Sequence, residues 1–143
     1  MVKIAFVSSM DTVFAQIAEC LVNAEGEGFV TAKSFGVLAQ DGEELPFEAL
    51  KALWLRGVET EDCVSRAFSE NVLTDYDIVI ALNKQIKFLL PKNDKILTVG
   101  DINDGQEFTF KHCSEIGEYL DACYTVDKFA EKLIEKIKNG DLL

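Results

Sequence analysis

Polar side chains in three parts of this sequence belong to the types that together carry out hydrolysis by a serine nucleophile. Ser8 offers a hydroxyl, His112 is the only histidine, and Asp101 and Asp104 each offer a carboxylate. Such a set can act as nucleophile, general base and orienting acid when a fold brings it together. Nothing in the spacing fixes that geometry, so a solvated loop histidine is the simpler interpretation and the one that we prefer.

Three aspartates of the same regions suggest metal binding as a second chemistry. Asp11, Asp101 and Asp104 would hold a divalent cation together with waters, because carboxylate oxygens are hard ligands. Two ordinary loop acids and one helix cap explain these residues more simply. We therefore predict no bound metal and no other cofactor.

The four cysteines are scattered along the chain and form no CxxC pair. Cys20 and Cys123 continue apolar helical patterns and are expected in the core, whereas Cys63 and Cys113 fall in predicted loops. Since the N-terminal residues lack the features of an export signal, we expect all four to be reduced thiols in a cytoplasmic protein.

Length and charge limit the classes of partner. The chain has 143 residues, 48% of them hydrophobic, which suits a single domain over residues 1–143. Its formal net charge of −11 repels phosphate backbones and anionic lipids, so we expect neither nucleic acid nor a membrane as partner. We expect a monomer or weak homodimer whose partner is an unknown protein or a small ligand.

Apolar runs alternate with helical patterns along the whole chain. The predicted strands are residues 2–7, 29–35, 77–82 and 95–99, and the predicted helices cover 14–22, 47–54, 83–90, 114–123 and 125–137. This alternation predicts an α/β fold, a three-layer sandwich around a four-stranded parallel sheet with flavodoxin-like winding. Ligands of such folds bind beyond the carboxyl ends of the strands, so residues 8–12, Asn83 and residues 101–112 mark the expected site.

The first of these loops carries a resemblance to low-molecular-weight protein tyrosine phosphatases and their arsenate reductase relatives. Their signature reads Phe-Val-Cys, five residues, Arg-Ser, and soon afterwards Met-Ala-Glu. This chain has Phe6-Val-Ser8 at the start of the segment and Gln16-Ile-Ala-Glu19 at its end. Asp101-Ile-Asn-Asp-Gly105 resembles the Asp-Ile-Pro-Asp-Pro segment of the family, which makes Asp104 the expected general-acid position. The likeness covers residues 1 to about 105 in order and implies a phosphotyrosine protein phosphatase I-like fold.

The same resemblance argues against the activity of the family. A phosphatase of this type uses a Cys thiolate to attack phosphorus and an Arg to hold the phosphate oxygens. Ser8 stands at the nucleophile position, Phe14 at the Arg position and Ala15 at that of the supporting Ser, while Met10 replaces a Gly. A Ser hydroxyl is hardly ionised without an adjacent base. We therefore predict a catalytically inactive member that acts as a binding or regulatory module.

The loop after the first strand stays the candidate ligand-binding loop. It comprises Ser8, Ser9, Met10, Asp11, Thr12, Val13, Phe14 and Ala15. Its backbone amides would bind an oxyanion or a phosphorylated ligand weakly, but the Asp11 carboxylate would repel a bound anion by roughly 3 kcal/mol at about 5 Å.

Several alternatives remain open from the sequence. One is an active tyrosine phosphatase or arsenate reductase. A reductase would also need two resolving cysteines, but Asn83 and Leu90 or its neighbours occupy those positions. Another is a hydrolase that uses Ser8 or the aspartates. A third is an apolar cleft for a peptide or partner, formed where aromatic residues replace the anion site. Its candidate residues are Phe14, Phe35, Phe108 and Phe110, of which about half are expected to be core.

Overall fold

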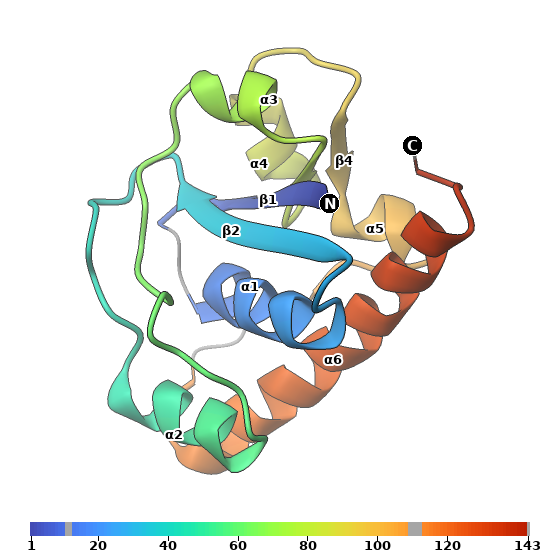
Figure 1. Ribbon diagram of the computed structural model, residues 1–143. Coiled ribbons are helices and arrows are strands. Elements are labelled where there is room, and N and C mark those ends of the chain that lie inside the picture. Colours follow the sequence, from blue (N-terminus) through green and yellow to red (C-terminus); the bar gives the residue numbers. More distant parts are fainter. Residues whose placement is uncertain (11–12, 109–112, 143) are drawn as a thin grey trace.

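A parallel sheet runs through the middle of the computed structural model, which describes residues 1–10, 13–108 and 113–142 (Figure 1). Its strands are β1 (Val2–Ser8), β2 (Val30–Gly36), β3 (Ile78–Ala81) and β4 (Ile96–Thr98), in the order β2-β1-β3-β4. The predicted four-stranded parallel sheet is therefore confirmed. The strands are short and mostly buried, as expected where helices cover both faces, although the edge strand β2 carries the exposed Lys33.

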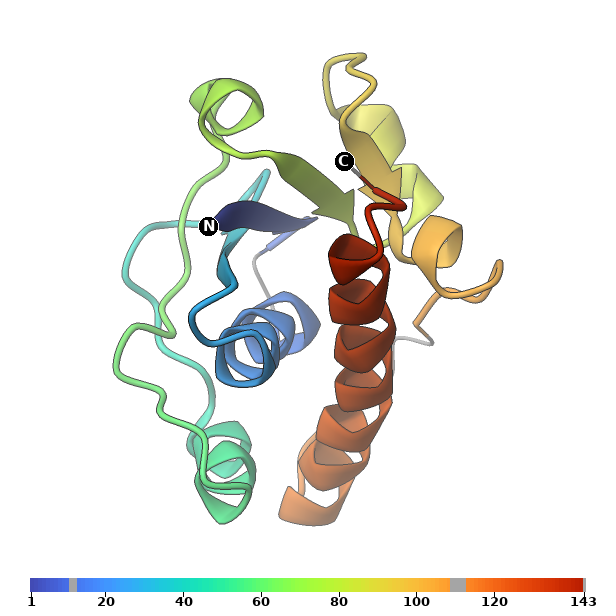
Figure 2. The ribbon, with the colours of Figure 1, turned by 45° about the vertical axis from the view of Figure 1, so that its right-hand side comes forward.

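Helices form a layer on each face of the sheet (Figure 1). One layer holds α1 (Val13–Glu25), α2 (Phe47–Leu55) and α6 (Ile116–Lys138), the other holds α3 (Asn71–Asp75) and α4 (Lys84–Leu89), and α5 (Val99–Ile102) follows β4. The long α6 runs along one side of its layer and contacts α1 and α2 (Figure 2). This arrangement is the predicted three-layer sandwich.

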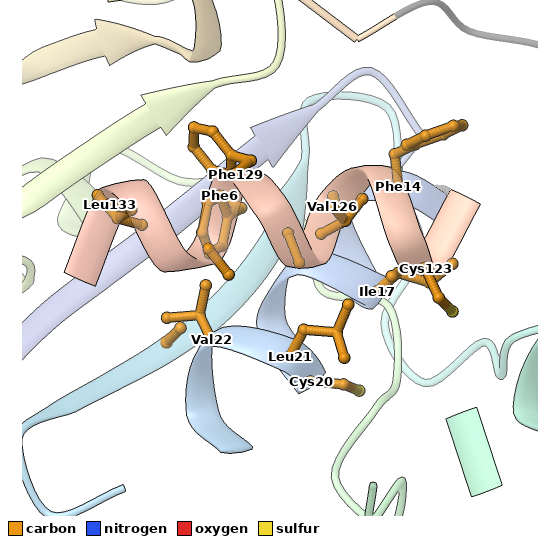
Figure 3. Packing of buried hydrophobic residues seen from close by; sticks show 14 of the residues in the cluster. Phe6, Phe14, Ile17, Cys20, Leu21, Val22, Cys123, Val126, Phe129 and Leu133 are labelled. Carbon is orange, nitrogen blue, oxygen red and sulfur yellow. The ribbon is translucent and has the colours of Figure 1, made fainter. Parts of the chain in front are cut away.

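Strand β1 contributes to both halves of the core because its side chains alternate between the two faces. Ile4 and Phe6 belong to the larger cluster, with α1 and α6. Ala5 and Val7 belong to the smaller cluster, which includes Ile86 of α4. In Figure 3, Phe6 lies beneath Phe129 of α6, with ring centroids 6.4 Å apart. Burial on both faces fixes the position of the strand.

Helix α1 is tied to the outer edge of β2. The Asn23 side chain accepts a hydrogen bond from Ala32 N at 2.7 Å and donates one to Ala32 O at 3.0 Å. Between the two elements, a Cβ at Gly26 would lie 2.2 Å from a methyl carbon of Val30, so only glycine fits this turn. The side chain of Asn23 thus pairs backbone groups that an edge strand otherwise leaves exposed.

The C-terminal half of the chain corrects one prediction. Two helices were expected over residues 114–137, but α6 is continuous. Thr125, expected to begin the second helix, donates its hydroxyl to Asp121 O inside α6. The helix starts with a capping box between Glu115 and Glu118, so Ser114 is not its N-cap. The short helices α3 and α5 were not predicted, because one turn carries no periodic apolar pattern.

The cysteines correct a second prediction. Cys20 of α1 and Cys63, in the loop before α3, form a disulfide, so the expectation of four reduced thiols is wrong for this pair. Both residues are buried, although Cys63 lies in a loop, as predicted. Cys123 is a free thiol in the core as predicted, and burial raises its pKa to about 11.

In the described ranges, the helices include none with the length and apolar character needed to cross a membrane.

Candidate functional site at the end of strand β1

The candidate site lies where the strand order changes direction, between β1 and β3. Val7 pairs with Ala81 there, so the loops after both strands open on the same edge of the sheet. The backbone of β1 continues beyond its last strand residue, because Ser8 O and Ser9 O accept hydrogen bonds from the amides of Val37 and Leu38 at 3.0 and 2.6 Å. The candidate loop is therefore anchored at its start to the segment that follows β2.

Ser8 is held in a buried position at the end of β1. It is only 4% exposed. Within the described ranges, its Oγ has no hydrogen-bond partner, so none of these residues serves it as a base. A hydroxyl without such a partner keeps its proton at neutral pH and is a poor nucleophile.

Aromatic packing dominates the region where α1 begins. Phe14, the second residue of α1, is buried with its ring centroid 5.6 Å from that of Phe108. Phe108 in turn packs edge to face against Phe129 of α6 at 5.3 Å. Figure 3 shows Phe14 at one end of this core, beyond Ile17 and Val126. These ring contacts extend the main core to the C-terminal end of the candidate loop.

A cavity of about 330 Å³ opens beside this aromatic pair. Phe14 and Phe108 line it together with the carboxylate residues Glu107, Glu118 and Asp121. Among the described lining residues none is a lysine or arginine, so the surroundings carry negative charge where an anion site needs positive charge. The charge of the residues that line this cavity is thus opposite in sign to that of a phosphate-binding pocket.

Of the four phenylalanines considered for an apolar cleft, Phe14 and Phe108 line this cavity, but its other described lining residues are mostly polar or acidic, so the apolar cleft stays a prediction. Phe35 lies in the smaller core cluster, where its ring packs against Tyr76 at 5.5 Å. It is one of the residues expected to be core. Phe110 lies outside the described residues.

The two aspartates expected near this edge are engaged in other contacts. Asp101 accepts a hydrogen bond from Thr98 N at 2.8 Å and caps α5. Asp104 receives a hydrogen bond from Lys132 Nζ at 2.9 Å, and this ammonium lowers the pKa of the carboxyl. A general acid needs the opposite shift. Neither aspartate hydrogen-bonds to Ser8.

The remaining residues of the candidate loop divide into core and surface. Ala15 is fully buried in α1, Val13 is half-buried at its start, and Met10 is exposed. Asp11 and Thr12 lie outside the described residues, as does His112. The structure therefore does not describe the hypothetical set of Ser8, His112 and an aspartate, or an Asp11 metal ligand.

A buried ionic group behind the loop was not predicted, although its residues fall inside the segments that carry the resemblance. Glu19 accepts hydrogen bonds from Ser34 N at 2.7 Å, Ser34 Oγ at 3.0 Å and Arg66 Nη1 at 2.7 Å. Burial raises the pKa of Glu19, and the Arg66 charge opposes that shift. This group joins α1 to β2 and to the segment before α3.

A cluster of three carboxylates lies where the C-terminal end of α1 meets α6. Oxygens of Glu25, Asp127 and Glu131 approach one another within 4.8 Å, and Arg56 forms an ion pair with Asp127. Desolvation and the neighbouring carboxylates raise the pKa of Glu25 to about 8. Helical spacing places Asp127 and Glu131 on one face of α6, but their proximity to Glu25 of α1 depends on tertiary packing.

The parallel α/β sandwich with a loop between β1 and α1 defines a class of protein that places its ligand site at the end of the first strand. The family model described as low molecular weight phosphotyrosine protein phosphatase matches residues 3–139. The chain belongs to this family. No curated protein matches it significantly.

Solved structures agree with this assignment. The low molecular weight protein tyrosine phosphatase from T. tengcongensis is 25% identical, with a TM-score of 0.86, covering 95% of this chain and 99% of that one. The YwlE arginine phosphatase from Geobacillus stearothermophilus is 22% identical, with a TM-score of 0.86 and coverage of 99% and 96%. A serine mutant of YwlE arginine phosphatase, with a phosphorylated active site serine, is 25% identical, with a TM-score of 0.84 and 95% coverage of both chains.

Proposed function

We propose that this protein is a catalytically inactive phosphatase-like domain that acts as a binding or regulatory module. The observation that carries the proposal is the packing of Phe14 against Phe108. The resemblance places the phosphate-holding Arg at this position. A buried aromatic ring offers no charge and no hydrogen-bond donor to a phosphate.

The chemistry of the neighbouring residues supports the same proposal. Ser8 at the nucleophile position is buried and lacks a base among the described residues. Asp104 at the general-acid position is paired with Lys132, which favours the charged carboxylate that cannot donate a proton. Loss of the nucleophile alone costs on the order of 10⁶ in turnover in other covalent mechanisms.

The test is turnover of an aryl phosphate monoester by the purified chain. We expect a rate no higher than that of Ser8→Ala. The double variant Ser8→Cys with Phe14→Arg should gain turnover that vanishes when the introduced cysteine is alkylated. Turnover by the unmodified chain that Ser8→Ala abolishes would overturn the proposal.

A serine nucleophile is the second candidate, favoured by one comparison. The YwlE arginine phosphatase serine mutant is described with a phosphorylated active site serine, so a related scaffold can transfer a phosphoryl group to serine. Mass spectrometry after incubation with phosphoarginine distinguishes the two proposals. The inactive module stays unmodified, whereas a serine acceptor gains one phosphoryl group at Ser8 and loses it in Ser8→Ala.

A further inference from the structure

A hollow on the far side of the sheet from α6 has a different character from the candidate site. It lies between α4 and β4 and has a volume of about 680 Å³, within the range of pockets that hold ligands. We call it the α4–β4 pocket. Leu90 and Ile96 form buried parts of its wall, and Phe88 and Lys84, Lys87 and Lys92 also line it.

Helix α4 exposes its largest apolar side chains. Phe88 is 90% exposed and Leu89 is 64% exposed, while Ile86 is the residue of this helix that packs in the core. Two adjacent large apolar residues at the rim of a pocket form a surface of the kind that binds partners. Because Phe88 lines the hollow only at its exposed rim and Leu89 is not among the lining residues, a small molecule inside the hollow would leave both side chains largely uncovered.

The charge around this pocket is opposite to that of the whole chain. Residues 84–97 contain four lysines and one acid, Asp94, in a protein of net charge −11. Three of these lysines, Lys84, Lys87 and Lys92, line the pocket. Over the described ranges none of the three forms an ion pair, whereas Lys51 and Lys132 pair with carboxylates. Unpaired cations beside an apolar hollow favour an occupant with both carboxylates and an apolar group.

We propose that the α4–β4 pocket binds an acidic peptide segment of a partner protein, with a large apolar side chain of that segment in the hollow. Carboxylates on either side of this side chain would meet Lys84, Lys87 and Lys92. A peptide fits better than an anionic membrane, because the net charge of −11 repels such a membrane and because the surface is concave. The proposal does not depend on the loop after β1.

The probe is a synthetic peptide with one Phe flanked on each side by two Glu, added to isotope-labelled protein. We expect saturable NMR shifts confined to residues 84–97, weakening as salt is added. Phe88→Ala should weaken binding about tenfold, and Lys87→Glu with Lys92→Glu at least as much. A peptide with Ala in place of Phe should bind correspondingly less.

The matched control is a second exposed lysine and phenylalanine pair. Lys51 lies over the ring of Phe47 on α2, 5.4 Å from its centroid, outside the α4–β4 pocket. Lys51→Glu and Phe47→Ala should leave the affinity for the peptide unchanged. Equal effects of both sets of variants, or no saturable shifts at residues 84–97, would overturn the proposal. Binding to anionic vesicles that Phe88→Ala reduces, without peptide binding, would assign the surface to a membrane instead.

Discussion

Single residues decide what chemistry is left at the end of β1. Phe14 and Phe108 fill the region beside the loop with apolar contacts, while Glu107, Glu118 and Asp121 line the adjoining cavity. Aromatic side chains at this position contribute to the core, and on our proposal they stand where the family has the cation that binds an anion. A phenylalanine at position 14 therefore stabilises the fold and, on our proposal, excludes the catalysis of the family.

Phe14→Ala tests the structural role of this ring. Because Phe14 is buried and stacks on Phe108, the change should lower the free energy of unfolding by about 3 kcal/mol, measured by urea denaturation. Phe88→Ala is the control, since this ring is 90% exposed, and should cost no more than about 0.5 kcal/mol. Similar small effects of both changes would show that Phe14 is not part of the core.

Glu19 of α1 joins three segments, because it accepts hydrogen bonds from Ser34 of β2 and from Arg66 before α3. Glu19→Gln should lower the free energy of unfolding by about 3 kcal/mol, because it removes the negative charge that Arg66 Nη1 contacts at 2.7 Å in a largely buried place. The matched control is Glu48→Gln, which breaks the exposed pair with Lys51 and should cost less than about 0.5 kcal/mol. Equal costs in denaturant would contradict the assigned role of Glu19.

Glu25 makes stability depend on pH. Its pKa of about 8 in the folded protein exceeds its ordinary value of 4.5, so the folded state holds a proton that the unfolded state releases. This contribution is present at low pH and is lost as pH rises through about 8. We expect the free energy of unfolding to fall from about pH 5 to about pH 8 more steeply in the unmodified chain than in Glu25→Gln. Parallel pH profiles of the two proteins would refute this.

At the scale of elements, helix α1 connects most of the structure. Asn23 pairs with the edge of β2, Glu19 reaches Ser34 and Arg66, and Cys20 is joined to Cys63. These links hold the long segment between α2 and α3 against the helix. The position of α1, and with it the C-terminal end of the candidate loop, is thus fixed by several contacts.

The disulfide makes a prediction about this long segment. Alkylation of the unfolded chain should label two of its four cysteines before reduction and all four afterwards. Reduction should lower the free energy of unfolding by about 3–4 kcal/mol, because the bond closes a loop with a sequence separation of 43. The variant Cys20→Ala with Cys63→Ala should not respond to reductant. Four labelled cysteines before reduction would show that no disulfide forms.

Local patterns predicted the strands and most helices, because runs of apolar residues indicate strands buried on two faces and apolar residues at helical spacing indicate helices. The helix predicted over residues 83–90 is present as α4, and the Asn83 side chain caps it by accepting a hydrogen bond from Ile86 N at 2.8 Å. Thr125 was misassigned because a hydroxyl that suits an N-cap also bonds to the carbonyl of Asp121 within a helix. Sequence alone does not distinguish these two uses.

At the scale of the whole molecule, long-range contacts account for what the sequence did not predict at the site. Asp104 was placed near the end of the sheet, but its partner Lys132 is 28 residues away on α6. The partners of the Cys20–Cys63 bond are separated by 43 residues. Such pairs depend on helix packing and leave no local pattern. The local apolar periodicity, by contrast, did place Phe14 correctly at the start of a helix after the first strand.

Charge is also arranged over the whole molecule. Lysines gather at the α4–β4 pocket, whereas the cavity between α1 and the segment after α2 is lined by Glu19, Glu27 and Glu59 among other acids. A surface divided in this way orients an approaching charged partner before contact. It agrees with a module whose task is binding.

The central claim is that aromatic packing has replaced the anion site at the end of β1. It is tested most directly by an NMR titration of isotope-labelled protein with phosphate and with vanadate, following the amides of residues 8–15. We predict that these amides do not move at millimolar oxyanion. Saturable shifts confined to this loop would contradict the claim, because they would show that its backbone still binds a phosphate-like ligand.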